Sequence, residues 1–439
     1  MKVLKFGGTS VGSAQRMKEV AKLITDGERK IVVLSAMSGT TNTLVEISDY
    51  LYKKNPEGAN EIINKLESKY RQHIDELFAT PEYKQKGLEL IKSHFDYIRS
   101  YTKDLFTLFE EKVVLAQGEL ISTAMMNYYL QECGVKSVLL PALEYMRTDK
   151  NAEPDPVYIK DKLQVQLELH PDAEIYITQG YICRNAYGEI DNLQRGGSDY
   201  TASLIGAAIN ASEIQIWTDI DGMHNNDPRI VDKTAPVRHL HFEEAAELAY
   251  FGAKILHPTC IQPAKYANIP VRLLNTMDPT APGTLISNDT EKGKIKAVAA
   301  KDNITAIKIK SSRMLLAHGF LRKVFEIFES YQTSIDMICT SEVGVSVSID
   351  NVKHLNEILD DLKKYCTVTV DKDMCIICVV GDLEWENVGF EAKALDAMRD
   401  IPVRMISFGG SNYNISFLIR ECDKKAALQS LSDALFNEE

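Results

Sequence analysis

The sequence lacks any uninterrupted apolar run close to the ~20 residues that a membrane-spanning helix requires. Its N-terminus leads directly into a predicted strand over residues 3–6, without the apolar segment of a signal peptide. The nine histidines show no H-x-x-H or HExxH spacing, and no Cys–His signature argues for a nucleophile. We therefore expect a cytoplasmic protein without a dedicated transition-metal site and without a covalent nucleophile.

Cysteine is sparse, and acidic residues outnumber basic ones. Eight cysteines scattered over 439 residues do not suggest a disulfide framework. The C-x-x-C pair Cys375 and Cys378 lies in the apolar run MCIICVV, which is typical of a strand. Strand residues three apart point to opposite faces, so we expect core cysteines and no zinc or redox pair. The net charge of −12 disfavours nucleic acid and anionic membranes as partners.

The first two thirds of the chain alternate strand and helix patterns. Residues 1–34 predict a strand, a helix with Met17, Val20 and Ile24 on one face, and a second, entirely apolar strand. Residues 43–130 are rich in helix patterns, and further strands are expected at SVLL, AEIYITQGYI, EIQIWTDI and PVRLLN. This alternation predicts an open, mainly parallel α/β sheet with helices on both faces, and ligands beyond the carboxyl ends of its strands.

The pattern changes after the polar, turn-rich stretch SNDTEKGK near residue 288. Two smaller units follow, each with a βαββαβ pattern typical of a ferredoxin-like sandwich, and we interpret them as an internal duplication. The strand CTVTVD closes the first unit and MCIICVVG opens the second. We predict three domains, over residues 1–293, 294–370 and 371–439.

A lysine precedes the glycines of the N-terminal stretch KFGGTSVGS. The spacing from Gly7 to Gly12 matches that of a phosphate-binding P-loop, but Ser13 stands where the P-loop lysine would be. The charge is instead at Lys5, inside the apolar strand. Because burying an unpaired ammonium is costly, Lys5 needs an anionic partner, and a phosphate is the obvious one.

Other polar loops follow predicted strands. They include Ser38–Thr41, RGGSDYTA and WTDIDGMHNNDPR, while Lys254 ends a predicted helix and Glu119 lies inside another. Each loop alone has at least an equal chance of being structural, because glycine pairs often turn a chain and Asp or Ser often caps a helix. Together they provide glycine loops, lysines and an arginine without a nucleophile. Phosphoryl transfer needs little beyond such positioning and charge neutralisation.

Four motifs in order, KFGGTSVGS, RGGSDYTA, TDIDG…DPR and FGAKILHP, resemble those of the aspartate kinases of the amino-acid-kinase fold. The C-terminal part resembles their paired ACT domains, with GFLRKVFEIF and SIDMICTSE similar to the lysine-regulated, monofunctional branch. The resemblance covers essentially the whole chain. It implies the amino-acid-kinase fold followed by two ACT domains, and the phosphorylation of L-aspartate to 4-phospho-L-aspartate with ATP and Mg²⁺.

The resemblance also implies roles for residues. The catalytic group would comprise Lys5, Asp199 and Lys254. The ATP site would comprise Lys5, Gly7, Gly8, Thr218, Asp219, His224, Asp227, Arg229 and Lys254. The aspartate site would comprise Thr41, Glu119, Arg195 and Ser198. The site for L-lysine as feedback inhibitor would comprise Met314, Gly319, Phe320, Leu321, Ile335, Asp336, Ser341 and Glu342.

Two departures from the family pattern affect these expectations. His224 replaces a tyrosine frequent in the nucleotide loop, which bears on nucleotide affinity, and Ala317 replaces a frequent hydroxyl in the effector loop. We expect a homodimer through the ACT domains, with a tetramer as the alternative, and no fused homoserine dehydrogenase after Glu439. The alternative functions are a sister kinase acting on another carboxylate, and an amino-acid sensor without catalysis.

Overall fold

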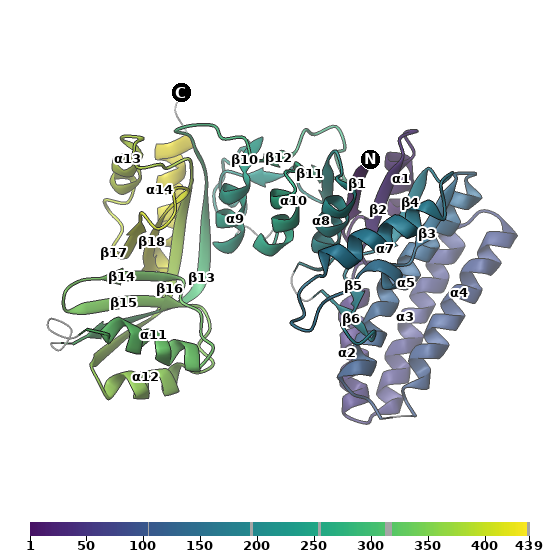
Figure 1. The fold of residues 1–439 in the computed structure, drawn as a ribbon, viewed down its shortest axis with the longest axis horizontal. Helices are drawn as coiled ribbons and strands as arrows, with labels where there is room; N and C mark the ends of the chain where they lie inside the picture. The colour runs from purple at the N-terminus through teal and green to yellow at the C-terminus, as the bar shows by residue number, and fades with distance from the viewer. Residues whose placement is uncertain (104, 194–195, 253–255, 312–317, 437–439) are drawn as a thin grey trace. The chain divides into compact units, whose positions relative to one another are not determined.

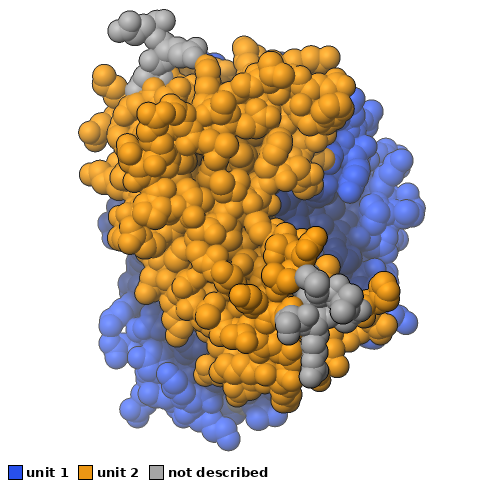
Figure 2. Space-filling view, turned by 90° about the vertical axis from the view of Figure 1, so that its left-hand side faces the viewer, with its two compact units in different colours: residues 1–223, 256–288 blue, residues 224–255, 289–439 orange. Residues whose placement is uncertain are grey.

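The computed structural model describes residues 1–103, 105–193, 196–252, 256–311 and 318–436. Its contacts form two compact units, unit 1 with residues 1–223 and 256–288, and unit 2 with residues 224–255 and 289–439 (Figure 2). Residues 224–255 thus group with the C-terminal part of the chain, although they lie inside the expected first domain. The expected domain boundaries stay a prediction. None of the described helices is long and apolar enough to cross a membrane.

Unit 1 is built on the expected open sheet. Its strands run in the order β12-β11-β7-β1-β2-β4-β3, and all neighbours are parallel except β12 against β11 (Figure 1). The strands are β1 (Lys2–Phe6), β2 (Lys30–Leu34), β3 (Ser137–Leu140), β4 (Ile175–Gln179), β7 (Ile214–Thr218), β11 (Val271–Asn275) and β12 (Thr284–Ser287). Strand β2 is buried throughout, as its apolar sequence predicts for a parallel sheet.

The predicted βαβ start is confirmed. Helix α1 (Ala14–Ile24) buries Met17, Val20 and Ile24, and Ser13 begins it by accepting a hydrogen bond from the Arg16 N–H. The residue at the P-loop lysine position is therefore a helix cap. Four longer helices fill residues 40–132, where helix was expected: α2 (Thr40–Tyr52), α3 (Pro56–Leu77), α4 (Pro81–Ser100) and α5 (Leu108–Glu132).

Helices α3, α4 and α5 lie side by side in unit 1 (Figure 1) and share one hydrophobic core with β1 and β2. Helix α5 is buried over most of its length, and its buried residues include polar ones such as Gln117, Glu119 and Ser122. The remaining elements of unit 1 are α6 (Ala142–Tyr145), β5 (Ile182–Arg184), β6 (Ile190–Asn192), α7 (Pro156–Glu168), α8 (Gly197–Ile209) and α10 (Gln262–Tyr266).

Unit 2 contains the two expected ferredoxin-like sandwiches, joined by one sheet in the order β14-β15-β13-β16-β18-β17. Its strands are β9 (Pro236–Val237), β10 (His239–His241), β13 (Ile295–Lys310), β14 (Met337–Thr340), β15 (Gly344–Ile349), β16 (Thr367–Gly381), β17 (Val403–Phe408) and β18 (Asn414–Arg420). Its helices are α9 (Phe242–Tyr250), α11 (Phe320–Ser330), α12 (Leu355–Lys363), α13 (Phe390–Ala397) and α14 (Lys424–Phe436).

Two long strands connect the sandwiches. The expected separate strands CTVTVD and MCIICVVG are one strand, β16, which pairs with β13 along its whole length. The register shifts between Lys301 and Ile304 divide β13, so its second half pairs with β15 and its first half runs beside the part of β16 that pairs with β18. Each sandwich keeps its own hydrophobic core. Cys375 and Cys378 are buried on β16, as expected for core cysteines.

Candidate active site

Lys5 lies near the carboxyl end of the central strand β1, between β2 and β7. Only 9% of the residue is exposed, and its Nζ lies 2.7 Å from Asp199 Oδ1. Asp199 stands in the first turn of helix α8. The sequence-based requirement for an anionic partner is thus met inside the protein by a carboxylate, and the structure brings together two of the predicted catalytic residues.

The glycine pair after β1 allows two loops to approach closely. A Cβ on Gly8 would lie 2.9 Å from the carbonyl oxygen of Ala36, and the Ser38 N–H donates to the Gly8 carbonyl oxygen at 3.1 Å. A Cβ on Gly7 would lie 3.5 Å from Lys5 Nζ. The glycines therefore keep the lysine head group and the neighbouring loop free of side-chain bulk.

The RGGSD segment turns the chain into helix α8. Gly196 and Gly197 have φ of 71° and 45°, a left-handed conformation that side chains rarely adopt. This turn places Ser198 and Asp199 in the first helical turn, where Ser198 Oγ accepts a hydrogen bond from Ser35 Oγ at 2.8 Å. Arg195, the predicted carboxylate clamp, lies outside the described residues.

Glu119 is the buried acid of the site. Helix α5 carries it, 3% of it is exposed, and its Oε1 accepts a hydrogen bond from the Ala36 N–H at 3.2 Å. Its Oε2 is buried and has no hydrogen-bond partner among the described residues. Burial raises the pKa of Glu119 to about 7. A cation at Oε2 would stabilise the charged form of this carboxylate.

These segments enclose a cavity of about 380 Å³ in unit 1. Four predicted site residues line it: Gly8, Thr41, Glu119 and Ser198. The other lining residues are Ser35, Ala36, Met37, Ser38, Gly39, Asn42, Tyr181 and Gly197. Gly197 and Ser198 directly precede Asp199, so the cavity adjoins the segment that carries the partner of Lys5.

Tyr181 is a lining residue that the sequence analysis missed. It was expected inside one strand over AEIYITQGYI, but β4 ends at Gln179 and a separate strand β5 begins at Ile182. The chain passes close to Ser198 at this break, since a Cβ on Gly180 would lie 2.3 Å from Ser198 Oγ. Tyr181 adopts φ 69°, and its N–H donates to Thr201 Oγ1 at 3.0 Å. Gly180, a glycine directly after an apolar strand, was the sequence signal for this break.

The predicted nucleotide residues are divided between the two units. In unit 1, Thr218 ends β7 and Asp219 is exposed directly after it. In unit 2, His224 Nδ1 lies 2.9 Å from Thr234 Oγ1, and Arg229 makes a bidentate pair with Asp227 at 2.9 and 2.7 Å. Hydrogen bonding to Arg229 lowers the pKa of Asp227. Lys254 lies outside the described residues.

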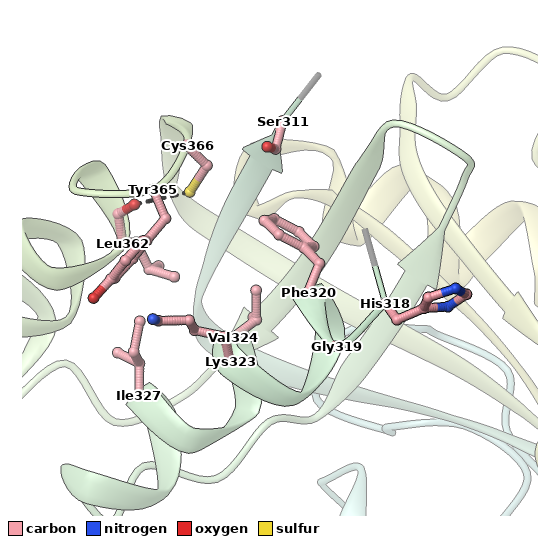
Figure 3. Close-up of a pocket in the computed structure, with 10 residues that line it drawn as sticks. All are labelled: Ser311, His318, Gly319, Phe320, Lys323, Val324, Ile327, Leu362, Tyr365 and Cys366. Carbon is pink, nitrogen blue, oxygen red and sulfur yellow. Dashed lines mark hydrogen bonds between the residues drawn. The ribbon is translucent and has the colours of Figure 1, made fainter. Parts of the chain in front are cut away.

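The predicted effector residues lie in the first ferredoxin-like sandwich. Gly319 and Phe320 line a cavity of about 200 Å³ between the start of α11 and the end of α12 (Figure 3). Lys323 Nζ sits 4.0 Å from the centre of the Tyr365 ring at this cavity. The complete lining is Ser311, His318, Gly319, Phe320, Lys323, Val324, Ile327, Leu362, Tyr365 and Cys366.

Asp336 does not line that cavity and has partners of its own. Its Oδ1 lies 2.7 Å from Lys301 Nζ and accepts a hydrogen bond from the Tyr250 hydroxyl at 2.9 Å. Among the other expected effector residues, Leu321 and Glu342 are exposed, Ile335 is half-buried, and the Ser341 N–H donates to the Gly344 carbonyl oxygen. Met314 and Ala317 lie outside the described residues.

Comparison with known proteins identifies the family. Residues 1–275 match the model of the amino acid kinase family, and residues 377–435 match an ACT domain. The chain is 35% identical to aspartokinase 1, chloroplastic, of Arabidopsis thaliana, covering 99% of this chain and 80% of the relative. It is 32% identical to lysine-sensitive aspartokinase 3 of Escherichia coli, covering 99% of each. The chain belongs to the aspartokinases of the amino acid kinase family.

Solved aspartokinases agree with this assignment along the whole chain. Escherichia coli aspartokinase III in complex with aspartate and ADP, described as the R-state, matches with a TM-score of 0.85 and 31% identity, covering 100% of both chains. The same enzyme in complex with lysine and aspartate, described as the T-state, matches with a TM-score of 0.80 and 33% identity, again over 100% of both. The expected aspartokinase resemblance and fold class are confirmed, while the individual roles of the site residues stay predictions.

The contact between the two loops at Gly8 generates a stability prediction. We expect Gly8→Ala to lower the free energy of unfolding by about 1–3 kcal/mol, because the new methyl group meets a backbone oxygen that cannot move alone. Urea denaturation measures the change. Gly410→Ala is the control, since no atom lies within 4 Å of a Cβ built there. Equal stability of the two variants would contradict the close approach.

Proposed function

We propose that this aspartokinase transfers the γ-phosphoryl group of ATP to the side-chain carboxylate of L-aspartate, giving 4-phospho-L-aspartate and ADP. A carboxylate oxygen of the substrate attacks the γ-phosphorus, and the bond from that phosphorus to the β–γ bridging oxygen breaks. The observation that carries the proposal is the buried Glu119 Oε2, which has no hydrogen-bond partner among the described residues. It lies in a cavity beside the chain segment that carries Asp199, the ion-pair partner of Lys5. It offers an ammonium-binding carboxylate near a buried lysine.

The lysine provides the charge that phosphoryl transfer requires. Negative charge on the transferring group is stabilised by a fixed cation in a water-poor site. Lys5 is such a cation, since it projects from a rigid strand and Asp199 fixes its head group. The N–H groups of Gly7 and Gly8 are assigned to the β- and γ-phosphates, as the resemblance implies. Lys254 completes the predicted catalytic group.

The aspartate molecule is assigned to the 380 Å³ cavity. Glu119 would accept the α-ammonium group at Oε2, with Thr41 and Ser198 as hydroxyl partners. Arg195 would bind the α-carboxylate through a bidentate contact. Escherichia coli aspartokinase III binds aspartate and ADP in its R-state structure, which supports this choice of substrates.

The nucleotide is assigned to Thr218, Asp219, His224, Asp227, Arg229 and Lys254. ATP enters as its magnesium complex, and we assign the ion to the substrate phosphates. No group of three or more His, Cys, Asp or Glu residues that could hold a metal ion occurs in the described part of the chain. Arg229 is paired with Asp227, so binding of a phosphate by Arg229 would exchange one anionic partner for another.

L-lysine is the proposed feedback inhibitor. Escherichia coli aspartokinase III in its T-state is a complex with lysine and aspartate, and this chain carries the same tandem ACT arrangement. Asp336 would bind the ε-ammonium group, and the backbone at Gly319–Leu321 and Ser341–Glu342 would bind the α-groups. The proposed assembly is a homodimer through the ACT domains, as the resemblance implies, and a second copy would complete the effector site.

The first test is acyl-phosphate formation by Lys5→Met. We expect kcat to fall about 10²–10³-fold, the loss typical of removing one transition-state charge partner. MgATP, L-aspartate and hydroxylamine trapping give the rate. Lys30→Met is the matched control, because Lys30 is a buried lysine on the neighbouring strand paired with Asp26 at the opposite end. Unchanged turnover in Lys5→Met, or no aspartate-dependent signal in the wild type, would contradict the proposal.

The raised pKa of Glu119 predicts a pH dependence of the KM for aspartate. Glu119 is protonated below about pH 7 and cannot then pair with the substrate ammonium. The KM should therefore rise as the pH falls through 7 and reach a plateau above it. Glu119→Gln should raise the KM about 10–100-fold and remove this pH dependence. Glu132→Gln, at the other end of α5, is the control, and a similar pH profile in Glu119→Gln would refute the role.

The effector assignment predicts that Asp336→Ala abolishes inhibition by L-lysine. The substitution removes the carboxylate proposed to hold the ε-ammonium group, while aspartate-dependent turnover continues. The readout is the ratio of hydroxamate formation with and without L-lysine, and the same ratio with L-threonine tests the choice of effector. Asp361→Ala, which removes a half-buried carboxylate of the same sandwich, should retain inhibition. Full inhibition of Asp336→Ala would overturn the assignment.

A further inference from the structure

Asp336 belongs to a charged cluster in unit 2. The ammonium of Lys301, on β13, lies 2.7 Å from Asp336 and 2.9 Å from Asp350, and 4.4 Å from the centre of the Tyr250 ring. The Asp336 side chain is 1% exposed, whereas that of Asp350 is 41% exposed. The predicted effector carboxylate is therefore already bound to a lysine of the chain itself.

The charges of this cluster leave room for one more cation. When both are ionised, Asp336 and Asp350 carry two negative charges, against the one positive charge of Lys301. Asp336 Oδ2 is buried and has no hydrogen-bond partner among the described residues. A buried carboxylate oxygen without a donor is costly, and a donor with positive charge satisfies it best. An arriving ammonium would bring the cluster to neutrality.

Tyr250 connects the cluster to helix α9. Its hydroxyl donates to Asp336 Oδ1 from the last residue of that helix. Two residues later, a Cβ on Gly252 would lie 2.1 Å from the Ala300 carbonyl oxygen, so the chain after α9 lies directly against the backbone before Lys301. Three residues before Tyr250 on α9, Glu247 accepts a hydrogen bond from the side-chain amide of Asn414, on β18, at 2.6 Å. Helix α9 is thus fixed to the ACT sheet at several points, four residues before Lys254.

We propose that Lys301 is a built-in competitor for the effector ammonium: L-lysine takes Asp336, Lys301 keeps only its pair with Asp350, and Tyr250 transmits the exchange to helix α9. This inference rests on the proposed lysine feedback and extends it to three residues without an assigned role. Because both ammonium groups are donors to the same carboxylate, Lys301 raises the concentration of L-lysine needed for inhibition. Asp350 lowers it by keeping the displaced charge paired.

The two charged residues give predictions of opposite sign. Lys301→Met should tighten L-lysine binding about tenfold, and Asp350→Asn should weaken it about tenfold, the factor expected for one hydrogen bond to a charged group. Titration calorimetry of the full chain measures the affinity at about pH 8, where Asp336 is best kept ionised. Lys424→Met is the control, since Lys424 forms a comparable pair with Asp302 at 2.7 Å in the same unit.

Tyr250→Phe tests the connection to α9 separately from binding. The substitution removes only the hydroxyl, so L-lysine still binds. The ratio of turnover without L-lysine to turnover with saturating L-lysine should fall by about tenfold, the factor expected for losing one hydrogen bond to a charged group. Tyr331→Phe is the matched control, because it removes a hydroxyl that donates to Asp361 at 2.8 Å in the same sandwich. An unchanged ratio in Tyr250→Phe would remove Tyr250 from the inference.

The outcomes separate this inference from the feedback itself. A wild type that neither binds L-lysine nor is inhibited by it overturns the proposed effector, and this inference with it. A wild type that responds while Lys301→Met and Asp350→Asn change affinity in the same direction, or not at all, overturns the exchange alone. Lys301→Met leaves Asp336 without its cation and could prevent folding. In that case Asp350→Asn, at a half-exposed residue, still tests whether the affinity for L-lysine falls as predicted.

Discussion

A buried lysine in the middle of a parallel sheet needs a counter-charge, and the catalytic half of this protein is arranged around that requirement. Lys5 obtains it from Asp199, which the left-handed turn at Gly196 and Gly197 places at the start of α8. Neither group is fully exposed to water, so their attraction is screened little. The pair fixes the lysine head group at the carboxyl end of β1, where open α/β sheets bind ligands.

Close backbone contacts give the site its shape. Gly8 and Gly118 of α5 both lie close to Ala36, and a Cβ built on Gly118 would be 2.7 Å from the Ala36 Cβ. Gly180 lies close to Ser198 in the same way. These contacts bring a strand end, two loops and two helices around one cavity. Helix α5 carries Glu119 to this cavity, where one carboxylate oxygen accepts from the Ala36 N–H and the other has no partner among the described residues. Rigid elements thus carry the polar groups that recognition requires.

Unit 2 combines chain segments expected to contact ATP with the ACT sandwiches. Asn226 donates to the carbonyl oxygen of Leu428 on α14 at 3.0 Å, and Val231 belongs to the core of the second sandwich. Tyr250 reaches the first sandwich at Asp336. The segments expected to contact ATP therefore pack directly against both sandwiches within unit 2.

Local sequence determined the βαβ start, the helical region, the two ferredoxin-like patterns and the need of Lys5 for an anion, because periodicity, capping and the cost of buried charge act over short distances. Tertiary structure decided the rest. Tyr181 lines the cavity where the strand breaks, at a point where Gly180 packs against Ser198 of a distant helix. Lys301 and Tyr250 meet Asp336 across 35 and 86 residues of sequence. No local pattern encodes such a pairing, since it arises from strand register and helix docking.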